Sequence, residues 1–303
     1  MSALVKANSN SGFPSLEIVF FRSLIQLVGA VIGALIAGVN PLGPPNSELR
    51  GWLMLRGFIG GLGIIAFFSS VTILPLADAN VVFFTNPILT SLIAHYILGE
   101  DYSLTDKALS FVCMLGVVLV SKPSTLFTLS SPYFAATTTT AANTASDVLP
   151  ASSDAGGSIM RALGVAVAFV GALCAASAYT LVRKIGKNVH FTVQVTYLGL
   201  VCTVMSGIPL LFSIQSFHLP ASLNDWSMLV SVGLCAVFSQ MLLNRGLQLA
   251  PAGPAILMRN LDVVFAYVFS VAVFNEIPDI MSIVGSTVII GCTVALGPSQ
   301  PEA

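Results

Sequence analysis

Charged side chains are scarce in this sequence. Lysine and arginine account for 12 of the 303 residues and aspartate and glutamate for 13, so only 8% of the chain is charged and the formal net charge is −1. Soluble domains carry about 25% charged residues, which excludes a globule covered by a solvated surface. The near-zero net charge provides no basic field for nucleic acid. With a mean hydropathy of +0.91, the chain is expected to fold in a lipid bilayer.

Reactive and metal-binding patterns are also missing. There is no C-x-x-C pair, no histidine at metal-ligand spacing from a cysteine, no glycine-rich phosphate loop and no nucleophile elbow. We therefore expect neither an enzyme nor a cofactor. The cysteines are expected to be small buried apolar residues: Cys113, Cys174, Cys202, Cys235 and Cys292. Residues 1–15 have no signal-peptide core, which predicts an uncleaved signal anchor in the first apolar run.

Long apolar runs are abundant. Each is close to the ~20 residues that cross a ~30 Å hydrocarbon core, and none alternates with period two, so all are predicted to be transmembrane helices. The nine predicted spans are 16–36, 51–73, 78–98, 105–121, 160–182, 191–212, 225–248, 253–274 and 279–297. The fold class is therefore an all-α polytopic membrane protein.

A low-complexity segment divides the chain into two halves. Residues 123–158 are rich in Ser, Thr and Ala and hold few large apolar side chains, which predicts a flexible linker. The predicted organisation is a first repeat over 1–122 with four helices, the linker, a second repeat over 159–298 with five helices, and a tail over 299–303.

The two halves match each other at one offset. Pro75 and Pro251 are 176 positions apart (251 − 75), as are Glu100 and Glu276 (276 − 100). The same offset superimposes four spans and their turns, which indicates an internal repeat. The run 160–182 would then map before Met1, so the first repeat is expected to lack its leading helix.

The placement of Lys and Arg predicts the orientation. With a cytosolic C-terminus, the cytosolic joins hold Arg50, Arg56, Lys107, Arg183, Lys184, Lys187 and Arg245, and the opposite side holds Lys6, Lys122 and Arg161. We therefore predict a cytosolic C-terminus, in the plasma membrane or in an endomembrane such as the ER or Golgi. A unit of five helices is odd, so the two units would be inverted relative to each other, as in many transporters.

Several short motifs carry a family resemblance. They are Leu16–Arg22, Leu74–Asn80 running to Asn86-Pro87, Leu98-Gly99-Glu100, Ala252–Ala255, Arg259–Phe265 and Asn275-Glu276. On these motifs the chain resembles the EamA-type branch of the drug/metabolite transporter superfamily, and within it the G subfamily of solute carrier family 35. The resemblance implies ten helices in two inverted five-helix repeats, with a solute cavity near the bilayer midplane and transport by alternating access.

Polar side chains inside the spans are the candidate solute ligands, because a charge in lipid costs at least ~2.5–3.5 kcal/mol. Arg259 and Asp262 lie three apart on one helix and either neutralise each other or form a cationic anchor with Asp262 holding the arginine. Asn86 occupies the position equivalent to Asp262 in the first repeat, and Asn260 lies in the same motif as Arg259. Arg22 either snorkels to the interface or provides a second anion anchor.

Four further residues are predicted to have structural or gating roles. Pro87 removes a backbone donor and leaves the carbonyl of the residue four before it free, which predicts a kink. Asp78 opens its helix, where capping is the simpler explanation. Glu100 and Glu276 lie at the turns after equivalent helices and are more often turn residues than ligands.

These residues predict a secondary transporter for a small organic solute that is anionic or zwitterionic. The partners expected are that solute and the lipid bilayer, with no nucleic acid and with a homodimer as one arrangement left open. Two alternatives remain at this point. One is a non-transporting membrane scaffold that regulates a partner, and the other is a nucleotide-sugar carrier of the same fold.

Overall fold

The computed structural model describes residues 15–44, 47–100, 104–121, 155–212, 223–265, 268 and 280–296. Every regular element in these ranges is helical, as the composition predicts. The elements are α2 (Ser15–Ile36), α3 (Ser47–Ile73), α4 (Leu76–Phe83), α5 (Asn86–Leu98), α6 (Leu104–Ser121), α8 (Ala155–Ile185), the 3₁₀ turn η2 (Gly186–Asn188), α9 (Phe191–Leu211), α10 (Leu223–Leu249), α11 (Ala252–Leu257), the 3₁₀ turn η3 (Met258–Asn260) and α13 (Ile280–Leu296). A helical stretch over 261–265 follows η3.

Seven helical segments in the described ranges are long and apolar enough to cross a membrane. A shorter apolar helix covers Met281–Ala295. Large apolar side chains are exposed along the outer helices, among them Leu200, Val204 and Ile208 of α9 and Val230, Leu234, Phe238 and Leu242 of α10. Such an outer surface suits lipid rather than water. The count of nine spans stays a prediction, because residues 269–279 lie outside the described part.

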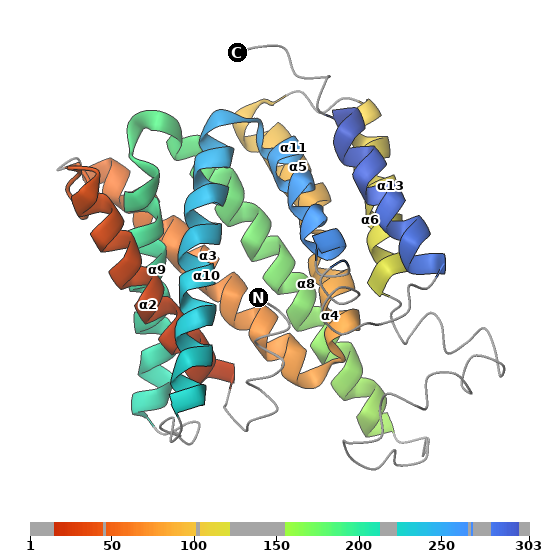
Figure 1. The fold of residues 1–303 in the computed structure, drawn as a ribbon, viewed down its shortest axis with the longest axis horizontal. Helices are drawn as coiled ribbons and strands as arrows, with labels where there is room; N and C mark the ends of the chain where they lie inside the picture. The colour runs from red at the N-terminus through yellow and green to blue at the C-terminus, as the bar shows by residue number, and fades with distance from the viewer. Residues whose placement is uncertain are drawn as a thin grey trace.

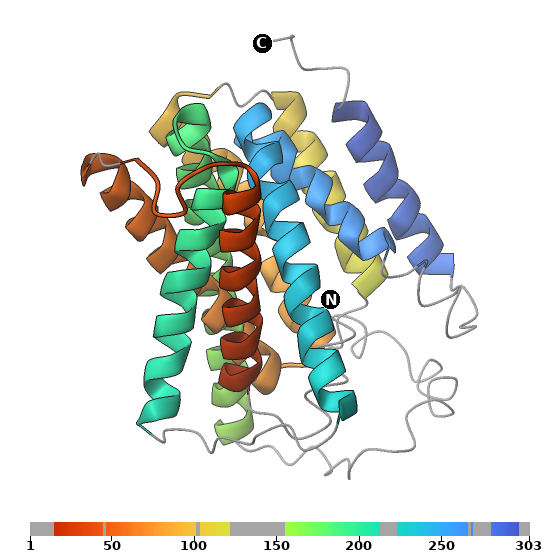
Figure 2. The same cartoon turned by 60° about the vertical axis from the view of Figure 1, so that its left-hand side comes forward.

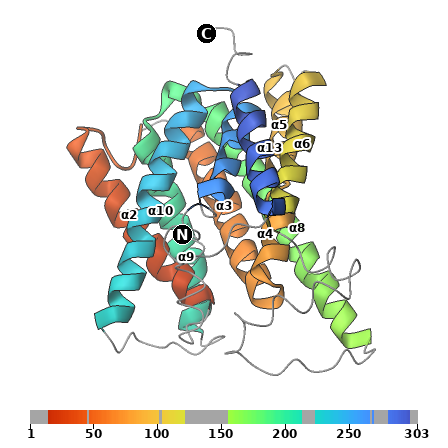
Figure 3. The ribbon, with the colours of Figure 1, turned by 45° about the vertical axis from the view of Figure 1, so that its right-hand side comes forward.

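The helices form one bundle with α3 and α8 at its centre (Figure 1). Helices α2, α9 and α10 stand side by side at one edge (Figure 2), and α6 and α13 form the opposite edge (Figure 3). Glycines allow these close approaches: an added Cβ on Gly63 of α3 would lie 3.1 Å from the Ala175 backbone of α8.

Helices related by the offset of 176 have matching bounds. Helix α3 begins at Ser47 and α10 at Leu223 (223 − 47 = 176), and the last residues of these two helices also differ by 176. Helices α2 and α9, which begin at Ser15 and Phe191, differ by 176 as well, and so do α6 and α13, which begin at Leu104 and Ile280.

The related helices that touch run antiparallel. An added Cβ on Gly207 near the end of α9 would lie 3.1 Å from Phe20 near the start of α2, and one on the earlier Gly199 would lie 3.0 Å from Leu27 further along α2. In the α6–α13 pair, an added Cβ on Gly116 would meet Ile289, and one on Gly285 would meet Val120, so this order is reversed too.

Two helices are broken at equivalent places. The run predicted as one span over 78–98 stops at Phe83 and resumes at Asn86, with Pro87 in the first turn of the new helix. The predicted kink at Pro87 is therefore a break, since proline cannot continue the hydrogen-bond ladder. In the second half α11 ends at Leu257 and passes through η3 before the helical stretch over 261–265.

Basic side chains gather at one end of the bundle, which we call the basic end. It holds the starts of α3, α6 and α9 and the ends of α5, α8 and α10. An apolar cluster of Leu53, Ile185, Val189 and Val193 lies at this end. Gln248 of α10 also donates hydrogen bonds there to the Gly186 and Val189 carbonyls. Arg50, Lys107, Arg183, Lys184, Lys187 and Arg245 lie on these segments. The assignment of Arg56 to a join was wrong: Arg56 lies inside α3 and is buried.

Candidate solute-binding site

Helix α2 carries four buried polar side chains. Glu17, Arg22, Ser23 and Gln26 are all buried on it. The helix packs closely, because Gly199 of α9 and Gly233 of α10 leave room for its side chains. The structure therefore places Arg22 inside the bundle, where only 5% of its surface is exposed, and not in the snorkelling position that was the alternative.

Arg22 has no anionic partner among the described residues. Its Nε and Nη1 donors lack hydrogen-bond acceptors. The ionisable groups that act on its charge are Cys202, Arg259 and Tyr179, and none of them is a carboxylate. Burying an ion costs several kcal/mol even after relaxation. The Arg22 site therefore favours an anion supplied from outside the described chain.

Arg259 lies close enough to Arg22 for the two charges to repel each other. It belongs to η3, and its Nη1 donates a hydrogen bond to the Tyr179 hydroxyl oxygen of α8. The guanidinium carbon lies 5.6 Å from the centre of the Tyr179 ring and 6.0 Å from that of Phe83, within the range of cation–π attraction.

Asp262 contributes less to this arrangement than the sequence predicts. Its Oδ2 lies 3.8 Å from Arg259 Nε, which is an ion pair but too long for a hydrogen bond. The Asp262 side chain is 70% exposed. Tyr179, rather than Asp262, therefore makes the hydrogen bond that orients Arg259.

The two candidate asparagines are buried but face different neighbours. Asn260 donates from Nδ2 to Cys113 Sγ of α6 at 3.2 Å, whereas the adjacent Arg259 faces α8. Asn86 opens α5, and neither atom of its amide has a hydrogen-bond partner. Unpaired buried amides are costly, so both positions suit a polar ligand or water. The structure brings Arg259 and Tyr179 together, with Arg22 within electrostatic range of both, and it leaves Asn260 on the α6 side.

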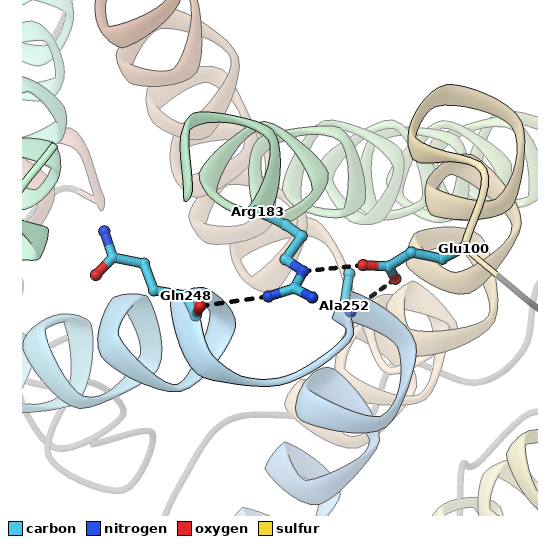
Figure 4. A network of polar contacts seen from close by, with 4 residues as sticks. All are labelled: Glu100, Arg183, Gln248 and Ala252. Atoms are coloured by element: carbon cyan, nitrogen blue, oxygen red, sulfur yellow. Dashed lines mark hydrogen bonds and ion pairs between the residues drawn. The ribbon is translucent and has the colours of Figure 1, made fainter. Parts of the chain in front are cut away.

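Glu100 joins four helices at the basic end (Figure 4). Its Oε1 accepts from Arg183 Nε at 2.9 Å, and its Oε2 accepts from the backbone N–H of Ala252, at the start of α11, at 3.0 Å. Arg183 also donates to the Gln248 carbonyl at 3.3 Å. A carboxylate at a helix N-terminus is favourable. Glu100 therefore lies at the predicted turn and joins neighbouring helices through its carboxylate. Glu276 lies outside the described residues.

Asp78 is buried in the first turn of α4. The N-cap residue of this helix is Pro75, which offers no side-chain cap. A carboxylate in the first turn favours the helix dipole, and the capping role of Asp78 stays a prediction.

Sequence reasoning missed several interior polar residues. Tyr179 orients Arg259, and Arg56, Gln194 and Asn244 form a second buried cluster. Glutamine, asparagine and arginine inside an apolar run were the available signal, because such residues rarely face lipid. For Tyr179 there was no such signal, because tyrosine is common near the ends of membrane helices.

Comparison with known proteins agrees with the helical architecture and with the motifs. Residues 2–122 and 162–296 match the EamA-like transporter family. Human solute carrier family 35 member G1 is 28% identical over 92% of this chain and 70% of its own length. The pseudopaline exporter of Pseudomonas aeruginosa is 26% identical over 99% of this chain and 92% of its own length.

One solved crystal structure shares the fold, with a TM-score of 0.73 at 14% identity, covering 95% of this chain and 90% of that one. The relatives are named as transporters, and the apolar helices are numerous enough for a multi-pass membrane protein. The resemblance stated from the motifs is confirmed, and the chain belongs to the EamA-like transporter family.

Proposed function

We propose that this protein is a secondary transporter that moves a small organic anion or zwitterion by alternating access. The observation that carries the proposal is Arg22, a buried arginine without a carboxylate neighbour, beside a second arginine, Arg259. A carboxylate or phosphate near both arginines would reduce their mutual repulsion, and an arginine can bind either group through two donors.

Tyr179 is the third ligand of the proposed site. Its oxygen accepts the hydrogen bond from Arg259, which leaves its O–H to donate to the solute. Arg22 is on α2, Tyr179 on α8 and Arg259 on η3, so one bound anion would connect three separate helices. Binding would therefore favour a conformation in which these helices approach one another, which gives the solute a differential affinity for two states.

The alternating movement rests on a proposed inverted repeat, with units over 1–122 and 159–298 joined by the linker 123–158. The matching helix bounds at an offset of 176 support it, and so does the opposite direction of the related helices. The equivalent breaks after α4 and α11 place irregular backbone beside Arg259 and Asn86, as in transporters whose sites are built on discontinuous helices.

Uptake into proteoliposomes tests the proposal. Purified protein is assayed with radiolabelled mono- and dicarboxylates, amino acids, sugar phosphates and a nucleotide sugar, and then as the Arg259→Ala variant. The matched control is Arg161→Ala, which removes an exposed arginine at the start of α8, away from the site. We expect an anionic or zwitterionic class to be transported, and Arg259→Ala to abolish its uptake while the control retains it. Wild-type rates in Arg259→Ala would remove the site assignment, and no uptake of any class would favour a scaffold.

A further inference from the structure

A second buried polar cluster lies at the basic end, separate from the bond between Arg259 and Tyr179. Arg56 of α3 donates from Nη1 to the Gln194 carbonyl at 2.7 Å and from Nη2 to Asn244 Oδ1 at 2.8 Å. Asn244 in turn donates from Nδ2 to the Gln240 carbonyl at 2.6 Å. We call Arg56, Gln194, Gln240 and Asn244 the Arg56 cluster.

The cluster carries a positive charge that the described residues do not neutralise. Arg56 is 2% exposed, and its Nε has no acceptor. Tyr179 is the ionisable group that acts on its charge, and no carboxylate does so in the described ranges. Gln194 is fully buried, and neither atom of its amide has a partner. The cluster therefore has donors to spare and no anion to receive them.

The equivalent positions at the other end of the bundle are apolar. Subtracting 176 from Gln194, Gln240 and Asn244, or adding it to Arg56, gives Ile18, Ile64, Phe68 and Val232. Ile18 and Phe68 form one apolar cluster with Val19 and Cys202, and Ile64 packs against it. Val232 is buried as well. Helix packing at these positions thus does not require polar side chains, and the polarity of the Arg56 cluster needs another cause.

The surroundings of the cluster suit an approaching anion. Exposed Arg50, Lys184, Lys187 and Arg245 lie on segments at the same end, which also carries Glu48. Two hollows open there, one of about 350 Å³ that includes Val193 and one of about 260 Å³ that includes Trp52. Val193 directly precedes Gln194, and Trp52 lies one turn before Arg56. The preference for cytosolic Lys and Arg explains exposed residues only, not a buried Arg56.

We infer that the Arg56 cluster is a second anion-binding station through which the solute passes between the basic end and the site at Arg22 and Arg259. The inference rests on the proposed function in taking the solute to be an anion. Arg56 lies on α3 and Tyr179, which binds Arg259, lies on α8, and these two helices pack against each other. The apolar counterpart around Phe68 offers no such station, so the two ends of the path differ in chemistry.

Charge-selective labelling tests this inference without knowing the solute. Gln240→Cys and Ile64→Cys place thiols at equivalent, half-buried positions of the two ends. Each variant in proteoliposomes is treated with a negatively charged methanethiosulfonate (sulfonatoethyl) and a positively charged one (trimethylammonioethyl). Peptide mass spectrometry separates the new site from the five native cysteines, and rates are normalised to those with a free thiol.

We expect the anionic reagent to react about tenfold faster than the cationic one in Gln240→Cys, which is the lower end of electrostatic rate enhancement. Ile64→Cys should show no such preference. Adding Arg56→Gln to Gln240→Cys should abolish the preference, a result that a merely structural Arg56 would not produce. Equal rates for both reagents in Gln240→Cys, or a preference that survives Arg56→Gln, would overturn the inference.

The outcomes separate this inference from the proposed function. The comparison of Gln240→Cys with Ile64→Cys needs no change at Arg56, so it remains decisive if Arg56→Gln does not fold. Arg259→Ala should lose uptake and retain the labelling preference at position 240. A labelling preference without transport of any anion would support the station and remove the proposed solute class. Anion transport without the labelling preference would support the proposed solute class and overturn the station.

Discussion

Arg183 and Arg22 show how differently the fold treats a charge at the end of the bundle and one in its interior. Arg183 is 27% exposed, and Glu100 and a carbonyl complete its hydrogen bonds. Arg22 is almost fully buried and has two donors without acceptors. An exposed ion pair contributes about 0–1 kcal/mol, whereas a buried unpaired ion costs several kcal/mol. The end contact is therefore explained by stability, and Arg22 is not, which supports a role in binding.

The largest effect is expected from removing the interior charge by Arg22→Met. Replacing a buried ion by an apolar side chain of similar length is often neutral or stabilising by about 1–4 kcal/mol. Uptake of the solute should fall at least ~30-fold, since truncating one partner of a buried charge pair costs about 2–5 kcal/mol. Proteoliposome uptake and thermal unfolding in detergent measure the two effects.

The matched variant Arg22→Lys retains the charge but not the planar donor set, and it should recover part of the uptake. A clear loss of thermal stability in Arg22→Met, with uptake reduced only in proportion to the folded fraction, would show that Arg22 is structural like Arg183.

A steric contact beside the end network should produce the next largest effect. A Cβ on Gly253 would lie 2.4 Å from Ser91 Oγ and 3.2 Å from Ser91 Cβ, so Gly253→Ala requires a shift of the Ser91 side chain or of α11 against α5. Overpacking of this kind costs about 1–3 kcal/mol. Thermal unfolding should show the loss, and the double variant Gly253→Ala with Ser91→Ala should recover part of it. If the double variant is no more stable than the single one, the close approach of these helices is not the cause.

The helices were predictable from the sequence because lipid requires long apolar runs. The bounds of α6, α9, α10 and α13 lie within two residues of the predicted spans, and the offset of 176 relates the first residues of α6 and α13. The interior was less predictable. Arg56 lies near the start of its apolar run and was assigned to a join, but α3 begins at Ser47, more than two turns earlier, and carries Arg56 inside.

Tyr179 and Arg259 show the limit of sequence reasoning at the site. They are 80 residues apart, and only the packing of α8 against the broken helix brings them together. The Arg259–Asp262 spacing pointed to the nearer partner, yet the longer-range contact supplies the hydrogen bond. Local periodicity identifies which residues share a helix face, and it carries no information about the helix that this face meets.

Glu100→Gln should have a smaller effect than the glycine substitution. The variant loses the ion pair with Arg183 and weakens the contact with the first N–H of α11, which together should cost about 1 kcal/mol for a partly exposed pair. A double-mutant cycle with Arg183→Gln, measured by thermal unfolding, should give a coupling energy of the same size. Additive effects of the two substitutions would show that the pair contributes nothing to stability.

The smallest effect concerns a charge at the basic end that acts on a neighbour through solvent. Burial first and the Arg245 charge second lower the pKa of His190 from its ordinary value near 6.5. Arg245→Gln should raise this pKa only slightly, because an exposed charge is screened within about 10 Å at 0.1 M salt. The pKa should remain below its ordinary value, since burial is unchanged. NMR titration of labelled histidine, assigned with His190→Gln, measures it.

Arg50→Gln is the matched control, because Arg50 lies at the same end and is not among the groups that act on His190. The direction in which folding stability changes with pH also follows from the lowered pKa. Because the folded pKa is lowered, protonation opposes folding, so this histidine should reduce stability as the pH falls through about 6.5, and less so in Arg245→Gln. Recovery of the ordinary pKa in Arg245→Gln would mean that the Arg245 charge, and not burial, dominates at the basic end, and the contrast between end and interior would fail.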